Sequence, residues 1–183
     1  MSRALVEGDL VFLRKPSARD RDEFLERAHA SQKLHGPWVS APADPDAFAA
    51  YLKRSRSTEM ETLLVCRHED GAMVGVYNIS QIYYGGLRSA YLGYYAFAPF
   101  SGQGYMREGI RLTLRHAFGP LKLHRLEANI QPDNAPSVAL VKGAGFRLEG
   151  YSPRYLKIGG RWRDHERWAI LAEDLHPGRR RRT

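Results

Sequence analysis

A glycine-containing junction between a predicted strand and a predicted helix has the residue types that can bind an anion. Tyrosine, leucine and phenylalanine are frequent in residues 87–97, which favours a strand. Beyond it, apolar residues recur at every fourth position, as on one face of a helix: Met106, Ile110, Leu114 and Phe118. Between the two lies Gly-Gln-Gly at residues 102–104, where outward N–H groups, the helix dipole and the lack of side chains would favour a phosphate. A turn that needs glycine for its conformation alone is the other interpretation.

The length and composition are those of a single domain. A chain of 183 residues can bury its own core, and we expect one domain over residues 1–175 and a basic tail at 176–183. No run of 18 apolar residues exists and the N-terminus is too charged for a signal peptide, so we expect a soluble, cytoplasmic protein without membrane contact. The single cysteine, Cys66, argues against a disulfide or a cysteine-rich metal site, and no metal is expected.

Half of the net charge of +8 comes from four consecutive arginines at residues 179–182. Such a run is usually disordered and solvated. It could also make a weak contact with RNA phosphates, although no aromatic residues alternate with the arginines.

The patterning of the chain predicts an α+β fold around one central sheet. Strands are expected at residues 5–15, 61–68, 73–84, 87–97, 123–130, 146–152, 154–158 and 162–171. Helices are expected at residues 18–30, 46–57, 105–118 and 134–143, with Ser17 and Pro45 as start signals. Residues 31–44 are expected to form a loop, in which Trp38 either covers the edge of the core or lines a substrate cleft.

Three segments, in this order, carry a resemblance to a known family. They are Ser-Gly-Gln-Gly-Tyr-Met-Arg-Glu at 101–108; Leu-His-Arg-Leu-Glu-Ala at 123–128 with Asp-Asn-Ala-Pro-Ser at 133–137 and Lys-Gly-Ala-Gly-Phe at 142–146; and Leu-Glu-Gly-Tyr at 148–151 with Tyr-Leu-Lys-Ile-Gly-Gly-Arg-Trp-Arg-Asp-His at 155–165. The sequence resembles the GNAT family of acetyl-CoA-dependent N-acetyltransferases, over about residues 3–175. Within it, the run at 160–165 is most similar to the RimJ/RimL branch, the ribosomal-protein alanine N-acetyltransferases.

The resemblance implies a mixed sheet, flanked by helices, that splays open between its fourth and fifth strands. By similarity these are residues 87–97 and 123–130, and acetyl-CoA would lie in the splay with its pyrophosphate on the N–H groups of residues 101–106. The family usually has Gln or Arg three residues before the first glycine, where this chain has Pro99. The residues implied to bind the cofactor are Tyr95, Phe97, Ser101, Gly102, Gln103, Gly104, Tyr105, Met106, Asn134 and Lys142.

The resemblance also assigns roles in catalysis. Backbone N–H groups near residues 94–97, left unpaired by the splay, would hold the thioester carbonyl. Many family members have a tyrosine acid seven residues after the asparagine that matches Asn134, but this chain has Val141 there. The RimL-like pattern places a serine three residues after the asparagine, so Ser137 is the expected proton donor to the thiolate. Asn134 and Ser137 could instead simply cap the short helix.

The general base is less defined. RimL-like sequences carry a glutamate six residues after Leu-Glu-Gly, where this chain has Leu156. Glu127 is our candidate base, and the alternatives are Glu108, His124 and His165, each of which could be purely structural. A free α-amine has a pKa of about 7.7–8.0 against about 10.4 for lysine, so far more of it is neutral near pH 7.5. The missing glutamate therefore fits an α-amine acceptor better than a lysine acceptor.

Three functions are compatible with the sequence. The first is acetylation of a protein N-terminus, plausibly of a ribosomal protein, by a monomer or homodimer whose acceptor groove is lined by aromatic residues: Trp38, Tyr83, Tyr84, Tyr91, Tyr94 and Tyr95. The second is acetylation of a small amine such as an antibiotic or polyamine, for which only scattered acidic residues are available: Asp44, Glu59 and Glu61. The third, suggested by Val141 and Leu156, is a non-catalytic acyl-CoA-binding or RNA-binding module.

Overall fold

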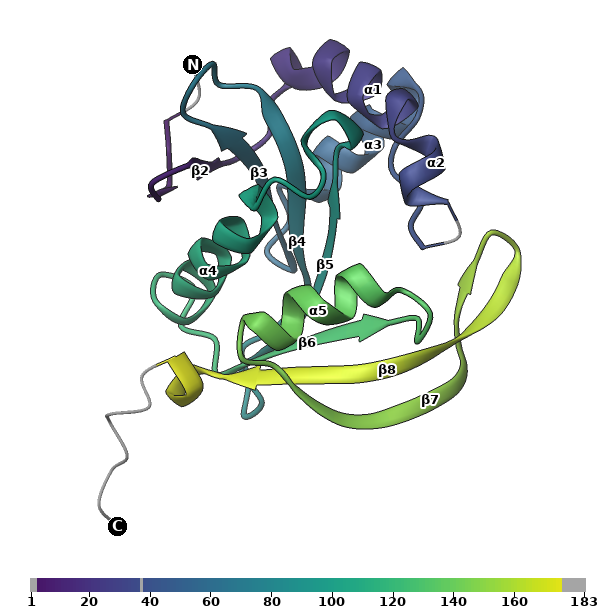
Figure 1. Cartoon of the computed structure of the whole chain (residues 1–183). Coiled ribbons are helices and arrows are strands. Elements are labelled where there is room, and N and C mark those ends of the chain that lie inside the picture. Colours follow the sequence, from purple (N-terminus) through teal and green to yellow (C-terminus); the bar gives the residue numbers. More distant parts are fainter. Residues whose placement is uncertain (1–2, 37, 176–183) are drawn as a thin grey trace.

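The computed structural model describes residues 3–36 and 38–175 (Figure 1). Its strands are β1 (Val6–Glu7), β2 (Val11–Arg14), β3 (Met60–Arg67), β4 (Met73–Tyr83), β5 (Ser89–Ala96), β6 (Arg125–Ile130), β7 (Arg147–Ile158) and β8 (Arg161–Leu171). Its helices are α1 (Arg21–Ala30), α2 (Gln32–His35), α3 (Pro45–Arg54), α4 (Tyr105–Phe118) and α5 (Ala135–Gly143). No helix in these residues is both long enough and apolar enough to cross a membrane.

One mixed sheet of eight strands runs through the described chain, in the order β1-β2-β3-β4-β5-β6-β8-β7. The only parallel neighbours in it are β5 and β6, which pair at three positions, from Ser89 with Arg125 to Tyr91 with Glu127. Beyond Tyr91 the two strands separate, and β5 runs toward α2 while β6 passes beneath α5 (Figure 1). The expected α+β fold and its splayed sheet are therefore confirmed.

The helices cover both faces of the sheet. Successive residues of a strand point to opposite faces. On one face, Phe97 packs edge-to-face on Phe24 of α1, and Tyr95 contacts His35 of α2. On the other, Tyr94 reaches Ser137 of α5. The end of β5 thus carries side chains toward both helical layers, exactly where its pairing with β6 has stopped.

The N-terminal strand expected at residues 5–15 is two strands, because the chain turns between Glu7 and Val11. The carboxylate of Glu108, on α4, accepts the N–H groups of Asp9, Leu10 and Val11 at 2.7, 2.7 and 2.8 Å. This division makes the splayed strands the fifth and sixth in the chain instead of the fourth and fifth.

Two further boundaries differ from the expectation. The strands expected at 146–152 and 154–158 are one strand, β7, whose register shifts between Ser152 and Leu156. Pro153 does not end it because β7 is the edge strand of the sheet, where a missing N–H is tolerated. The loop expected at 31–44 contains the short helix α2. The tail predicted at 176–183 lies outside the described residues.

Candidate active site

The junction before α4 has the geometry of an anion site. Gly104 is the N-cap of the helix, with φ of 88°, and Gly102 has φ of 78°. The first backbone bond of α4 runs from the Glu108 N–H to the Gly104 carbonyl, so the three preceding N–H groups have no partner inside the helix. A Cβ added at Gly102 or Gly104 would meet nothing within 4 Å. The two glycines therefore face open space, which leaves room for a phosphate to approach the loop.

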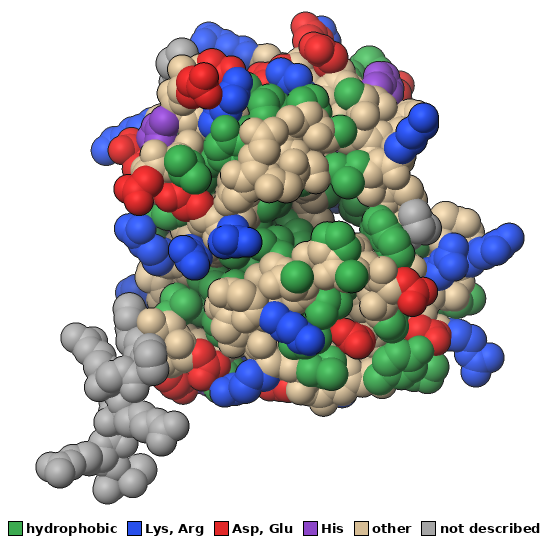
Figure 2. Space-filling model, in the orientation of Figure 1, with side chains coloured by type: hydrophobic (Ala, Val, Ile, Leu, Met, Phe, Trp, Pro, Cys, Tyr) green, Lys and Arg blue, Asp and Glu red, His purple; other side chains and the backbone are tan. Residues whose placement is uncertain are grey.

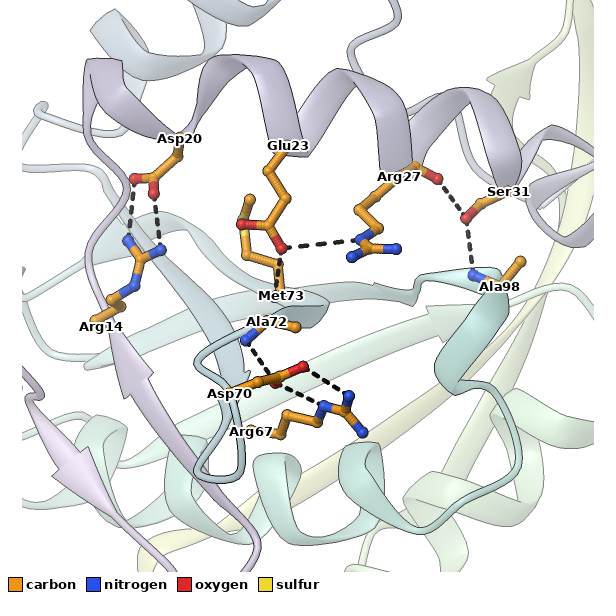
Figure 3. Close-up of polar contacts among 10 residues, drawn as sticks. All are labelled: Arg14, Asp20, Glu23, Arg27, Ser31, Arg67, Asp70, Ala72, Met73 and Ala98. Carbon is orange, nitrogen blue, oxygen red and sulfur yellow. Dashed lines mark hydrogen bonds and ion pairs between the residues drawn. The ribbon is translucent and has the colours of Figure 1, made fainter. Parts of the chain in front are cut away.

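The loop is fixed from the side of α1 (Figure 3). The buried hydroxyl of Ser31 accepts the Ala98 N–H at 2.8 Å and donates to the Arg27 carbonyl at 2.6 Å. The guanidinium groups of Arg27 and Arg67 lie 5.1 and 5.0 Å from the ring centroid of Phe100. The loop that carries the candidate anion site is thus attached to α1 and to the end of β3.

A cavity of about 780 Å³ passes through the splay. Figure 2 shows the hollow, with apolar side chains at its floor. Its lining comes from α2 and the following loop, the end of β5, the glycine loop with α4, and α5: Leu34, His35, Trp38, Val39, Tyr94, Tyr95, Ala96, Phe100, Ser101, Gly102, Gly104, Met106, Arg107, Arg111, Asn134, Pro136, Ser137, Ala139, Leu140 and Gly143. This set of described residues holds two arginines and no carboxylate.

The edge of β5 presents backbone groups to this cavity. The Phe97 N–H donates to the Val74 carbonyl on β4 at 2.9 Å. Backbone groups alternate in direction along a strand, so the N–H groups of Tyr94 and Ala96 point the other way, toward the opened edge. They are available to a ligand carbonyl, as an oxyanion hole requires.

Two hydroxyl groups meet across the cavity. The Tyr94 Oη and Ser137 Oγ atoms are 2.6 Å apart. Asn134 is the N-cap of α5, and its Oδ1 accepts the Ser137 N–H at 3.3 Å, so the cap uses the serine backbone and leaves its hydroxyl for Tyr94. Burial raises the pKa of Tyr94, while the bond to Ser137 partly offsets this, and the phenol stays protonated at neutral pH. The pair can therefore supply a proton.

The structure gathers only part of the predicted cofactor set around the cavity. Its lining includes six of those residues: Tyr95, Ser101, Gly102, Gly104, Met106 and Asn134. Phe97 is fully buried in the core, and Lys142 places its ammonium 5.3 Å from the Trp168 ring centroid. The Gln103 side chain donates to the Pro99 carbonyl at 2.8 Å, which holds the loop, and the Tyr105 ring packs edge-to-face on Phe100.

The predicted base and its alternatives all have partners elsewhere. Glu127 accepts the Arg125 Nε–H at 2.8 Å and is not part of the cavity lining. Glu108 holds the turn before β2, His124 contacts Glu173 at 3.1 Å, and the Nδ1 of buried His165 contacts the Arg163 carbonyl at 3.0 Å. Their contacts are those of structural residues.

Sequence reasoning missed several lining residues. Arg107 and Arg111 are four residues apart near the start of α4, and this spacing beside a glycine loop was a usable signal. His35 lies in α2, a helix of one turn that the pattern did not predict. Trp38 lines the cavity, whereas Tyr83 and Tyr84 are exposed on β4 and just beyond it, outside the lining. Among the described residues, no group of three or more His, Cys, Asp or Glu side chains could hold a metal ion.

The fold and this site define a class of protein. Residues 11–147 match the Acetyltransferase (GNAT) domain model, and the chain belongs to the GNAT family of N-acetyltransferases. It is 31% identical to the probable N-acetyltransferase YjcK of Bacillus subtilis, over 93% of this chain and 98% of that protein. It is 36% identical to the [ribosomal protein uS5]-alanine N-acetyltransferase of Escherichia coli, over 61% of this chain and 57% of that protein.

Solved structures agree with this assignment. Mycobacterium smegmatis RimJ, in complex with CoA-disulfide, superposes with a TM-score of 0.84 at 32% identity, over 91% of this chain and 84% of that one. Spermidine N-acetyltransferase from Vibrio cholerae, solved with CoA and spermine, has a TM-score of 0.79 at 21% identity, over 91% and 98% of the two chains, which is a likeness of fold alone.

Proposed function

We propose that this enzyme transfers the acetyl group of acetyl-CoA to the N-terminal α-amine of a protein, with ribosomal proteins as the candidate acceptors. The relatives named for uS5 alanine acetylation and the RimJ structure support this acceptor class. The observation that carries the proposal is the cavity through the splay, which has donors for an anion at one end and no carboxylate in its described lining.

The lack of a carboxylate in the described lining of the cavity supports an α-amine as the acceptor. A polyamine or lysine is almost fully protonated near neutral pH, and a site for such a cation needs negative charge. Two of the three acidic residues considered for this role are occupied: Asp44 caps α3 through the Ala47 N–H, and Glu61 contacts His116 and Lys15 at 3.0 and 3.1 Å. An α-amine depends less on negative charge in the site, because a substantial fraction of it is neutral at pH 7.5.

The residues of the site fit acetyl-CoA. The open N–H groups at the start of α4 and the side chains of Arg107 and Arg111 would hold its phosphates. When bound, acetyl-CoA supplies an acetyl group activated as a thioester. The N–H groups of Tyr94 and Ala96 would hold the carbonyl oxygen and stabilise the negative charge that develops on it. Ser137, hydrogen-bonded to Tyr94, would deliver a proton to the departing sulfur.

Replacing Gly102 by valine is expected to weaken acetyl-CoA binding about tenfold or more. A side chain there blocks the approach to the N–H groups, and one lost hydrogen bond to a charged group is about 1.5–3 kcal/mol. Isothermal titration calorimetry measures the affinity. Gly71→Val is the matched control, because Gly71 has a similar φ of 75°, equally open surroundings and a place in the β3–β4 turn. Equal affinity in the two variants would remove the loop from the site.

A panel of acceptors tests the proposed function. We expect thiol release from acetyl-CoA with peptides that begin with a free Ala or Ser. We expect none above background with the same peptides Nα-blocked and carrying lysine, or with polyamines and aminoglycosides. Turnover confined to the small amines would replace the proposal with acetylation of a small molecule. Acetyl-CoA binding without turnover on any acceptor would support the non-catalytic alternative.

A further inference from the structure

We propose that His35 is the general base of this enzyme and that its Nδ1 atom accepts the proton lost by the acceptor amine. The inference rests on the proposed function only for its choice of acceptor. His35 ends α2, is 6% exposed, and lines the cavity on the face of β5 that carries Tyr95.

The hydrogen bond of the ring fixes its tautomer. His35 Nε2 lies 2.9 Å from the Ala96 carbonyl oxygen. A carbonyl only accepts hydrogen bonds, so Nε2 carries the proton, and Nδ1 of the neutral ring carries the lone pair. Among the described residues, Nδ1 has no hydrogen-bond partner. Since His35 lines the cavity, the proposal places Nδ1 at the cavity wall.

The surroundings keep the imidazole neutral. Burial lowers the pKa of His35, and the bond to Ala96 only partly offsets this. The ring centroids of Tyr95 and Phe97 lie 5.1 and 6.3 Å away, and the backbone N–H of His35 donates to Ser31. Tyr95 adds no charge, since burial raises its pKa well above the ordinary value. No charged side chain of the described residues is among the recorded contacts of the ring.

The position places a base and an acid on opposite sides of the same strand edge. In a strand, the N–H and C=O of one residue point to the same side. The Ala96 carbonyl that holds His35 therefore points into the same opening as the Ala96 N–H, which we assign to the thioester carbonyl. Ser137 and Tyr94 approach that opening from the α5 face. The reacting carbon would lie between the two groups.

The proton balance of the transfer is complete with these groups. The lone pair of the amine forms the N–C bond while the C–S bond breaks, and its electrons leave on sulfur. One proton passes from the amine nitrogen to His35 Nδ1. The sulfur takes a proton from the Ser137 hydroxyl. Water in the cavity then returns a proton to the pair of hydroxyl groups of Ser137 and Tyr94 and takes one from the imidazolium, so each group regains its starting state. The products are the acetylated amine and free coenzyme A.

His35→Gln is the decisive variant. The glutamine amide can occupy the position of Nε2 and keep the bond to Ala96, but it has no basic lone pair. We expect kcat/KM for the free-N-terminal peptide to fall about 10²-fold at pH 7, with acetyl-CoA affinity unchanged. The part of the pH–rate profile that reports the titration of His35 should vanish. Only the titration of the acceptor amine should remain, with a pKa of about 7.7–8.0. His68→Gln is the matched control, because His68 Nε2 also contacts a carbonyl, that of Gly8 at 3.1 Å, and lies outside the cavity lining.

A measurement without turnover checks the same assignment. In the ¹⁵N spectrum of the histidine rings of the free protein, the signals lost in His35→Gln should be those of a neutral ring with Nε2 protonated. A protonated Nδ1, or a variant whose kcat/KM stays within about threefold of wild type with an unchanged profile, overturns the inference.

If His35→Gln fails to fold, His35→Ala with added imidazole replaces it, and absence of rescue counts against the base. If the wild-type enzyme prefers a small amine, the proposed function fails. The ratio of kcat/KM between wild type and His35→Gln, measured with that amine, still decides the role of His35.

Discussion

The Ser137→Ala enzyme should lose about 10²–10⁴-fold in kcat, the range typical of a lost general acid. Its affinity for acetyl-CoA should be unchanged, because alanine keeps the N–H that Asn134 caps and removes only the hydroxyl that meets Tyr94. Steady-state kinetics with a saturating peptide acceptor, together with calorimetric titration of acetyl-CoA, separate the two quantities.

Tyr94→Phe distinguishes a proton relay from a lone serine. It removes the partner hydroxyl and keeps the ring that packs on Tyr77 at 5.4 Å between centroids. If the two hydroxyls act as a unit, the double variant should be no slower than the slower single variant, since residues that act together are not additive. Turnover of Ser137→Ala equal to that of wild type would end its role as the acid.

The Asp20→Asn protein should be less stable than wild type by about 3–5 kcal/mol, the range for breaking a buried ion pair. Asp20 is 8% exposed and binds the Arg14 guanidinium with both oxygens, at 2.7 and 3.0 Å (Figure 3). It also accepts the N–H and hydroxyl of Ser17. The substitution leaves the Arg14 side chain, which is 12% exposed, without its counterion. Urea unfolding at pH 7 measures the loss, and Asp22→Asn, on an exposed carboxylate, should change stability by less than about 1 kcal/mol.

The same pair predicts a pH dependence. Burial favours the neutral form of Asp20, but the bonds from Arg14 and Ser17 outweigh it and lower its pKa. A carboxyl whose pKa is lower in the folded state stabilises the fold above its unfolded value of about 3.9, and this contribution is lost as the pH falls through the folded value. The stability gap between wild type and Asp20→Asn should therefore shrink in acid. A gap that is constant from pH 7 to pH 3 would contradict this.

Local patterning predicted the elements that shape the site. The strand–glycine–helix junction at 102–104 is visible in sequence because glycine, apolar spacing and β-rich residues are local signals. The splay itself came from resemblance and not from pattern, since pairing between β5 and β6 is a long-range property. Ser137 was identified through the resemblance to the RimL-like pattern, in which a serine lies three residues after the asparagine, whereas its bond to Tyr94 joins residues 43 positions apart.

The residues whose observed contacts differ most from the sequence interpretation are those with partners far away in the sequence. Glu108 was a candidate base, but its carboxylate binds three N–H groups 97–99 positions away. Lys142 was expected to bind cofactor, yet its ammonium lies near Trp168. His35 has no signal in the sequence, because a single helical turn has too few residues to show a period, and its bond to Ala96 spans 61 positions.

The early end of the β5–β6 ladder gives this molecule a free strand edge in its interior. Exposed edges of sheets are hazardous because any extended chain can pair with them, and proteins usually cover or charge them. Here the unpaired end of β5 lines a cavity whose other walls include α2, α4 and α5. Another sheet cannot reach it, whereas a slender chain with its own amide groups can. The protein thus keeps the pairing capacity of an edge strand and restricts it to a ligand thin enough to enter the cavity.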